Sequence, residues 1–199
     1  MRGSRKEPAN FPNCTLGILA GGQATRLGGI DKAWLQRDCV PQVLRLHDMF
    51  VSQIRTTLVS TNRNLPRYVE HGLQTVADRI VDAGPLAGID ALVAACRTEW
   101  LMTLPVDVVA VPPDFLARFA ANGQGTFAED GDGSQPLIAL WPVAKTRDAV
   151  ASSLAANALA VHELQSRLDM LPTRFGHFRF GNLNTPDDLD GAGVTIGTI

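Results

Sequence analysis

The chain has few cysteines and no excess of charge of either sign. Its three cysteines, at positions 14, 39 and 96, match neither a zinc-binding spacing nor a disulfide framework. Lys and Arg number 18 against 20 Asp and Glu, so the net charge of −2 does not favour nucleic acid as a partner. No apolar run reaches the roughly 18 residues that a membrane span needs. These absences predict a cytoplasmic protein that binds neither nucleic acid nor a membrane.

A polar segment opens the chain. Residues 1–14 carry positive charge and two prolines but lack the apolar core of a signal peptide, so we predict a flexible N-terminal arm. Residues 15–199 contain neither repeats nor a low-complexity linker, and their length is that of one domain.

Two kinds of apolar segment alternate along the first 123 residues. Short aliphatic or β-branched runs predict strands, and apolar residues at helical spacing predict helices. The predicted strands are 15–20, 55–60, 73–77 and 100–104, and the predicted helices are 42–53, 66–71, 85–97 and 113–122. This alternation is typical of a three-layer α/β fold, with a doubly wound, mostly parallel sheet and helices on both faces. A ligand is expected at the edge where the strands' carboxyl ends meet.

The remaining third of the chain follows a different pattern. We predict two strands around a turn, at 125–128 and 137–141, and then a helical stretch within 144–171. A strand of alternating phenylalanines at 174–180 and a short terminal helix at 186–189 follow.

The most informative segment follows the first predicted strand. Residues 19–32 contain four glycines together with Arg26 and Lys32. Glycines allow the backbone to approach a phosphate and aim N–H groups at it, and the two cations supply countercharge. The spacing fits neither the Gly-x-Gly-x-x-Gly nor the Walker A pattern. We predict a phosphate-binding loop in which Lys32 is exposed without ligand; a solvated surface loop is the alternative.

Polar residues follow the later strands. Asp107 interrupts an apolar run after the fourth strand, where an unpartnered carboxylate is unfavourable. This position favours a Mg²⁺ ligand over a helix cap or a loop hydrogen bond. Asp78 is either a ligand contact or half of a surface ion pair with Arg79. Asn182 and Asn184 either face a ligand together or mark a turn.

These segments resemble a known family. The segment after the first strand resembles the signature of nucleotidyltransferases, and most closely that of molybdenum cofactor guanylyltransferases. The residues that carry this resemblance are Leu19-Ala20-Gly21-Gly22, Arg26 and Gly28-Gly29-Ile30-Asp31-Lys32. Four later segments resemble further motifs of the family, in the same order along the chain: Gly84–Ile89, Pro105–Asp107, Gln135–Leu137 and Asn182–Pro186. The resemblance extends from Leu16 to Leu189 and implies the fold of a Rossmann-like nucleotidyltransferase.

The resemblance implies transfer of GMP from GTP to the terminal phosphate of molybdopterin, with release of pyrophosphate and with Mg²⁺ as cofactor. GTP would bind the N-terminal half, and molybdopterin the C-terminal part through Asn182 and Asn184. The implied nucleotide contacts are Leu19, Ala20, Gly21, Gly22, Lys32, Asp78 and Asp107, of which Asp107 also binds Mg²⁺. On chemical grounds, Arg26 and Lys32 would stabilise the departing pyrophosphate. Cofactor-delivering or molybdoenzyme-chaperone proteins are the implied protein partners.

Three segments depart from the family pattern. Ser60 stands where the family carries asparagine, so either Ser60 or Asn62 would make that contact. The family's Cys-Asp-x-Pro is replaced by Val106-Asp107-Val108-Val109, and its Gly-x-Pro-Leu by Cys39-Val40-Pro41-Gln42. A cytidylyltransferase acting on the same pterin is the close alternative, although Gly21-Gly22 favours guanine. A non-catalytic nucleotide- or pterin-binding module is the other alternative, against which Lys32 and Asp107 argue.

Overall fold

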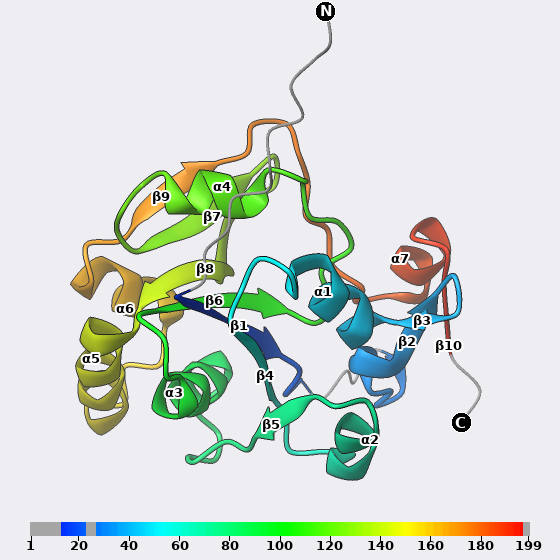
Figure 1. Ribbon diagram of the computed structural model, residues 1–199, viewed down its shortest axis with the longest axis horizontal. Helices are drawn as coiled ribbons and strands as arrows, with labels where there is room; N and C mark the ends of the chain where they lie inside the picture. Colours follow the sequence, from blue (N-terminus) through cyan, green and yellow to red (C-terminus); the bar gives the residue numbers. More distant parts are fainter. Residues whose placement is uncertain (1–12, 23–26, 197–199) are drawn as a thin grey trace, which may run out of the picture.

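A computed structural model describes residues 13–22 and 27–196 of the chain (Figure 1). The predicted α/β architecture is confirmed, because a mostly parallel seven-stranded sheet carries helices on both faces. The strand order is β5-β4-β1-β6-β8-β7-β9. The strands are β1 Cys14–Leu19, β4 Thr56–Ser60, β5 Gln74–Val76, β6 Trp100–Pro105, β7 Thr126–Asp130, β8 Gly133–Pro142 and β9 Leu171–Arg174. Most of the predicted arm, residues 1–12, lies outside the described residues.

The four strands β5, β4, β1 and β6 are parallel and end together. Leu19 at the end of β1 pairs with Ser60 of β4 on one side and with Pro105 of β6 on the other. Ser60 in turn pairs with Val76 of β5. The carboxyl ends of these strands therefore form one edge of the sheet, which is the edge that the sequence predicts for ligand binding.

Helices cover both faces of the sheet (Figure 1). One face packs against α1 Gln42–Phe50, α2 Leu65–Glu70 and α4 Phe115–Ala120, and the other against α3 Pro85–Ala95, α5 Val143–Ala155 and α6 Val161–Arg167. Neighbouring residues of β6 divide between the layers, since Leu101 belongs to the α3 side and Met102 to the α1 side. Helix α3 lies very close to β1, because a Cβ at Gly17 would be only 2.8 Å from Leu92 Cδ1.

A small second sheet joins residues 194–196 to residues 35–41. The strands β2 Leu35–Arg37, β3 Val40–Pro41 and β10 Val194–Ile196 pair in the order β10-β2-β3, beside η2 Lys32–Trp34 and α7 Pro186–Gly191. The sequence analysis did not predict these strands, which have two or three residues each. The pairing brings the C-terminal segment to the part of the chain that carries Lys32.

The predicted strand at 174–180 is wrong. Strand β9 ends at Arg174, and Gly176 then turns the chain with a φ of 63°. The alternating Phe175 and Phe180 instead pack together with a centroid separation of 5.1 Å, and Phe175 also stacks on Phe115 at 5.7 Å. The pattern of phenylalanines that predicted a strand thus reflects one aromatic cluster, to which a turning segment contributes.

None of the described helices is long and apolar enough to cross a membrane.

Candidate functional site

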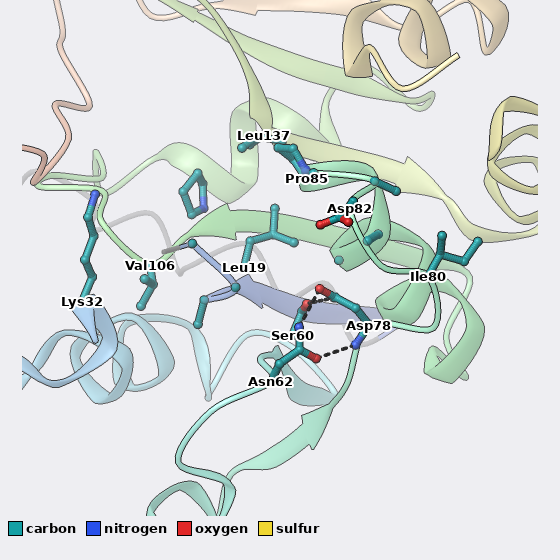
Figure 2. A pocket seen from close by; sticks show the side chains of 18 of the residues that line it. Leu19, Lys32, Ser60, Asn62, Asp78, Ile80, Asp82, Pro85, Val106 and Leu137 are labelled. Carbon is teal, nitrogen blue, oxygen red and sulfur yellow. Dashed lines mark hydrogen bonds between the residues drawn. The ribbon is translucent and has the colours of Figure 1, made fainter. Parts of the chain in front are cut away.

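A cavity of about 620 Å³ lies at the carboxyl edge of the parallel strands (Figure 2). The predicted site residues that line it are Leu19, Ala20, Gly21, Gly22, Lys32, Ser60, Asn62, Asp78 and Asp107. The loop between β5 and α3 also lines it through Ile80, Val81 and Asp82, which the sequence analysis did not assign. Their position between Asp78 and the Gly84–Ile89 motif was the available signal. Arg26 lies outside the described residues.

One end of the cavity is formed by Lys32 and Asp107. The Lys32 ammonium donates hydrogen bonds to Asp107 Oδ2 at 2.8 Å and to Asn184 Oδ1 at 2.7 Å. The Lys32 side chain is only 15% exposed, so the prediction that it is exposed was wrong. It is covered because the turn after β6 and the C-terminal segment both contact it. Three segments that are far apart in sequence therefore meet at one ammonium group.

The backbone at Lys32 is fixed by its neighbours. Asp31 caps η2, because its carboxylate accepts a hydrogen bond from the Ala33 N–H at 3.1 Å and another from the Asn64 side-chain amide at 2.8 Å. Trp34 is buried beneath the Arg67 guanidinium, which lies 4.1 Å from its ring centroid. These contacts anchor the short helix from which the lysine extends.

Asp78 forms the other end of the site, as Figure 2 shows. Its carboxylate accepts hydrogen bonds from Ser60 Oγ at 3.3 Å and from Asn62 Nδ2 at 2.8 Å, and its N–H donates to Asn62 Oδ1 at 2.9 Å. Both alternatives for the family's asparagine thus contact the same carboxylate. Arg79 pairs with Asp90 at 2.6 Å, so the predicted alternative of an Asp78–Arg79 ion pair is not formed.

The strand ends and α3 approach each other closely at this end. A Cβ at Gly88 would lie 2.9 Å from Ser60 Oγ and 2.9 Å from Leu19 Cδ2, so a larger residue would displace both. A Cβ at Gly21 would lie 3.9 Å from Asp78 Oδ2. The backbone at Gly21 therefore passes directly beside the Asp78 carboxylate.

The two asparagines near the C-terminus have different surroundings. Both are exposed, but Asn184 contacts Lys32, whereas Asn182 forms an isolated antiparallel bridge with Val108. The N–H of Asn184 donates to Asp188, the residue that also completes the capping box of α7. Hydrogen bonds from Thr185 and Asn184 hold the pKa of Asp188 below its usual range. The structure thus brings Asn184, but not Asn182, to the Lys32 end.

A buried carboxylate supports the segment that leads to these asparagines. Asp130 is 8% exposed and accepts hydrogen bonds from the N–H of Phe180 at 2.9 Å, the N–H of Asp132 at 2.9 Å and the Gln135 amide at 3.2 Å. Burial raises the pKa of Asp130, but these hydrogen bonds and the nearby Arg179 outweigh it, so the pKa is lowered.

We expect Asp130→Asn to destabilise the fold by about 1–3 kcal/mol, because an amide cannot accept all three hydrogen bonds. A group whose pKa is lowered by folding contributes stability above its unfolded pKa, about 3.9, and loses it as the pH falls through the lower folded value. The difference between parent and variant in urea unfolding should thus be constant above about pH 5 and shrink below about pH 4. Asp114→Asn, at an exposed ion pair, should change stability by less than about 0.5 kcal/mol at every pH.

Asp107 is one of three carboxylates that line the cavity, with Asp78 and Asp82. Within residues 13–22 and 27–196, no group of three or more His, Cys, Asp or Glu side chains is arranged to hold a metal. A cation here would depend on one protein carboxylate together with oxygen atoms of the ligand and water. Mg²⁺ accepts this donor set, since it commonly takes one or two carboxylates and completes its shell with phosphates and water.

Comparison with known proteins finds relatives that cover most of the chain. The profile of the family described as "MobA-like NTP transferase domain" matches residues 16–169. A protein of Polynucleobacter asymbioticus named molybdenum cofactor guanylyltransferase is 33% identical over 188 residues, covering 89% of this chain and 94% of the relative. A protein of the same name from Yersinia pseudotuberculosis is 33% identical over 189 residues, covering 90% of this chain and 94% of the relative.

Solved structures share the fold at lower identity. Molybdopterin-guanine dinucleotide biosynthesis protein A from Archaeoglobus fulgidus superposes with a TM-score of 0.69 at 18% identity, over 90% of this chain and 96% of that one. The 2-C-methyl-D-erythritol 4-phosphate cytidylyltransferase from Thermus thermophilus gives 0.65 at 16% identity, over 89% and 96%. The chain thus shares its fold with a cytidylyltransferase as well as with a molybdopterin-guanine dinucleotide biosynthesis protein.

Proposed function

Because this chain belongs to the MobA-like NTP transferase family and is a nucleotidyltransferase, we propose that it transfers GMP from GTP to molybdopterin. A terminal phosphate oxygen of the pterin attacks the α-phosphorus of GTP, the bond from that phosphorus to the bridging oxygen breaks, and pyrophosphate leaves. The observation that carries the proposal is that Lys32, Asp107 and Asp78 line one cavity, with Lys32 and Asp107 at one end and Asp78 at the other. A charged end for phosphates and a hydrogen-bonding end for a base are what this reaction needs.

We assign the guanosine to the Asp78 end. Guanine presents two neighbouring donors, its ring N–H and its exocyclic amino group, to a carboxylate acceptor, whereas cytosine presents only one amino group. Ser60 and Asn62 hold the Asp78 carboxylate in place. Gly21 has no side chain to cover this carboxylate, whereas a Cβ there would be in van der Waals contact with Asp78 Oδ2, at 3.9 Å.

We assign the triphosphate to the Lys32 end. Both reactants are anions, so the barrier is lowered mainly by alignment and by neutralisation of charge. In this proposal Lys32 exchanges its contacts with Asp107 and Asn184 for phosphate oxygens and stabilises the charge on departing pyrophosphate, together with Arg26. Asp107 holds Mg²⁺, which when bound supplies further neutralisation and polarises the α-phosphate.

We place the pterin beside the C-terminal segment, through Asn184 and Asn182. Asn184 lies against the same ammonium as Asp107, so an acceptor bound there would meet the nucleotide phosphates. The N-terminal half then binds GTP and the C-terminal part the acceptor. The proposal includes exchange of the pterin with cofactor-delivering or molybdoenzyme-chaperone proteins, and a cytoplasmic location in keeping with three free cysteines.

The assignment predicts that GTP binds more tightly than ATP, CTP or UTP. We expect Asp78→Asn to weaken GTP binding by about 1–3 kcal/mol, because an amide offers one acceptor where the carboxylate offers two. Calorimetry with the four nucleotides measures both effects. Pyrophosphate release with GTP, Mg²⁺ and molybdopterin tests the reaction itself.

Asp82→Asn is the matched control, since Asp82 also lines the cavity but makes no hydrogen bond to Ser60 or Asn62. It should leave GTP affinity within about twofold of the parent value, a difference under 0.5 kcal/mol. Equal affinities of the parent for GTP and CTP would contradict the guanine assignment and favour the cytidylyltransferase. Binding of GTP without any pyrophosphate release would favour the non-catalytic module.

A further inference from the structure

Three side chains converge on two backbone carbonyls that follow Asp107. Gln42 Nε2 donates to Val108 O at 2.6 Å, and Arg45 Nη2 donates to Val108 O at 3.0 Å and to Val109 O at 3.2 Å. Arg37 Nη1 donates to Val109 O at 3.1 Å. Arg37, Gln42 and Arg45 are called the carbonyl-binding cluster below. Its members come from β2 and α1, outside the cavity lining.

The carbonyl-binding cluster has an unusual charge balance. Gln42 is 1% exposed, and its side-chain oxygen accepts a hydrogen bond from Arg45 Nε at 3.0 Å. Within the part of the chain that the structure describes, neither arginine forms a salt bridge with a carboxylate. Burial and the neighbouring Arg37 lower the pKa of Arg45. Two adjacent cations that bind carbonyls instead of carboxylates are unfavourable on their own, so their contacts with the turn must offset this repulsion.

The turn that carries Asp107 is held from the opposite side as well. The Leu183 N–H donates to Asp107 O at 2.9 Å, and the N–H groups of Val109 and Ala110 donate to Phe180 O at 3.1 and 3.0 Å. The main chain of the C-terminal segment thus binds one side of the turn, and the carbonyl-binding cluster binds the other. Together they leave the Asp107 backbone little freedom to move.

Two of the departures from the resembled family's pattern meet at this point. The sequence has Gln42 in one altered segment and Val108-Val109 in the other, 66 residues away. The structure joins them through the Gln42–Val108 hydrogen bond. The altered segment at 39–42 therefore contributes a polar contact to the turn that carries the candidate metal ligand.

We infer that Arg37, Gln42 and Arg45 are positioning residues that set the place of the Asp107 carboxylate by binding the carbonyls of the two residues after it. The inference rests on the proposed function of Asp107 and deepens it. Side chains that orient a metal ligand typically change metal affinity or activity about 10–100-fold when they are removed. The carbonyl-binding cluster acts in this way through the backbone, without touching substrate.

The chain offers matched controls for two of these residues. Gln165 is 2% exposed and donates to Pro136 O at 2.8 Å, so Gln165→Leu mimics the loss of Gln42. Arg147 donates to Val93 O at 3.2 Å, so Arg147→Ala mimics the loss of Arg45. Both controls remove a side chain bound to a backbone carbonyl, but neither carbonyl lies beside Asp107.

The experiment compares Gln42→Leu and Arg45→Ala with these controls. Three quantities are measured: the Mg²⁺ concentration at half-maximal pyrophosphate release, the affinity for GTP by calorimetry with and without Mg²⁺, and stability in urea. We expect the Mg²⁺ midpoint to rise or kcat to fall about 10–100-fold in the two test variants. GTP affinity without Mg²⁺ should stay within about twofold, and both controls should keep the parent's midpoint and kcat.

Two results would overturn the inference. In the first, the test variants keep the parent's Mg²⁺ midpoint and kcat. In the second, control variants that are destabilised as much as the test variants show an equal change in Mg²⁺ midpoint or kcat. Arg45→Lys is the second variant if Arg45→Ala does not fold, because lysine keeps the charge but lacks the planar group that binds Gln42 and two carbonyls. If the parent itself does not transfer GMP, the proposed function fails. The inference is then judged by the Mg²⁺-dependent part of GTP binding, which must weaken in the test variants and not in the controls.

Discussion

Replacing Asp107 with asparagine will lower GMP transfer about 100–1,000-fold, the loss typical of removing one group that stabilises charge in the transition state. Asparagine has nearly the same size, but it lacks the negative charge that holds a divalent cation. The side chain is 20% exposed and ion-paired with Lys32, so we expect stability to change by no more than about 1 kcal/mol. The measurement is pyrophosphate release against Mg²⁺ concentration, with urea unfolding of both proteins.

The comparison needs a carboxylate from the same cavity that does not contact Lys32. Asp82→Asn serves, because Asp82 lines the cavity on the loop between β5 and α3. It should keep the parent rate and Mg²⁺ midpoint within about twofold, under 0.5 kcal/mol. Should Asp107→Asn turn over at the parent rate with an unchanged midpoint, Asp107 would be a residue of the turn only, and the cation would bind elsewhere.

The parallel half of the fold could be predicted because each element carries its own pattern. Strand β1 is a short apolar run followed by glycines, and α3 is a mostly apolar stretch that begins with a proline, so both were located from sequence. The site edge then followed from topology, since parallel strands end together. The fold of this half is therefore encoded largely in local segments of the sequence.

The rest depended on contacts between segments that are far apart in sequence. The small sheet has strands of two or three residues, and its pairing of β10 with β2 joins positions about 160 residues apart. The ion pair between Lys32 and Asp107 and the contact of Lys32 with Asn184 likewise join residues that are 75 and 152 positions apart. Residue types and the family resemblance together singled out residues that the structure places around one cavity. Their mutual contacts could not be predicted, because spacing along the chain says nothing about which carboxylate faces which ammonium.

Lys32→Ala is the second change for which we expect a large effect. It should lower kcat/KM about 100–1,000-fold, because it removes the described cation nearest Asp107, where the pyrophosphate is proposed to leave. The fold should remain, since an ion pair that water still reaches contributes about 0–1 kcal/mol. Turnover per folded molecule and the urea midpoint, measured on the same preparation, separate the two effects.

Two further variants test whether position or charge matters. Lys145→Ala removes an exposed lysine of α5 that does not line the cavity, and should leave both measurements unchanged. Lys32→Arg keeps the positive charge, but its planar group replaces a compact ammonium that lies 2.8 Å from Asp107 and 2.7 Å from Asn184, so we expect only part of the activity to return. A Lys32→Ala protein that unfolds more easily yet turns over normally per folded molecule would contradict the phosphate role. Lys32 would then serve only to join the turn after β6 to the C-terminal segment, and the countercharge for the pyrophosphate would have to come from another residue.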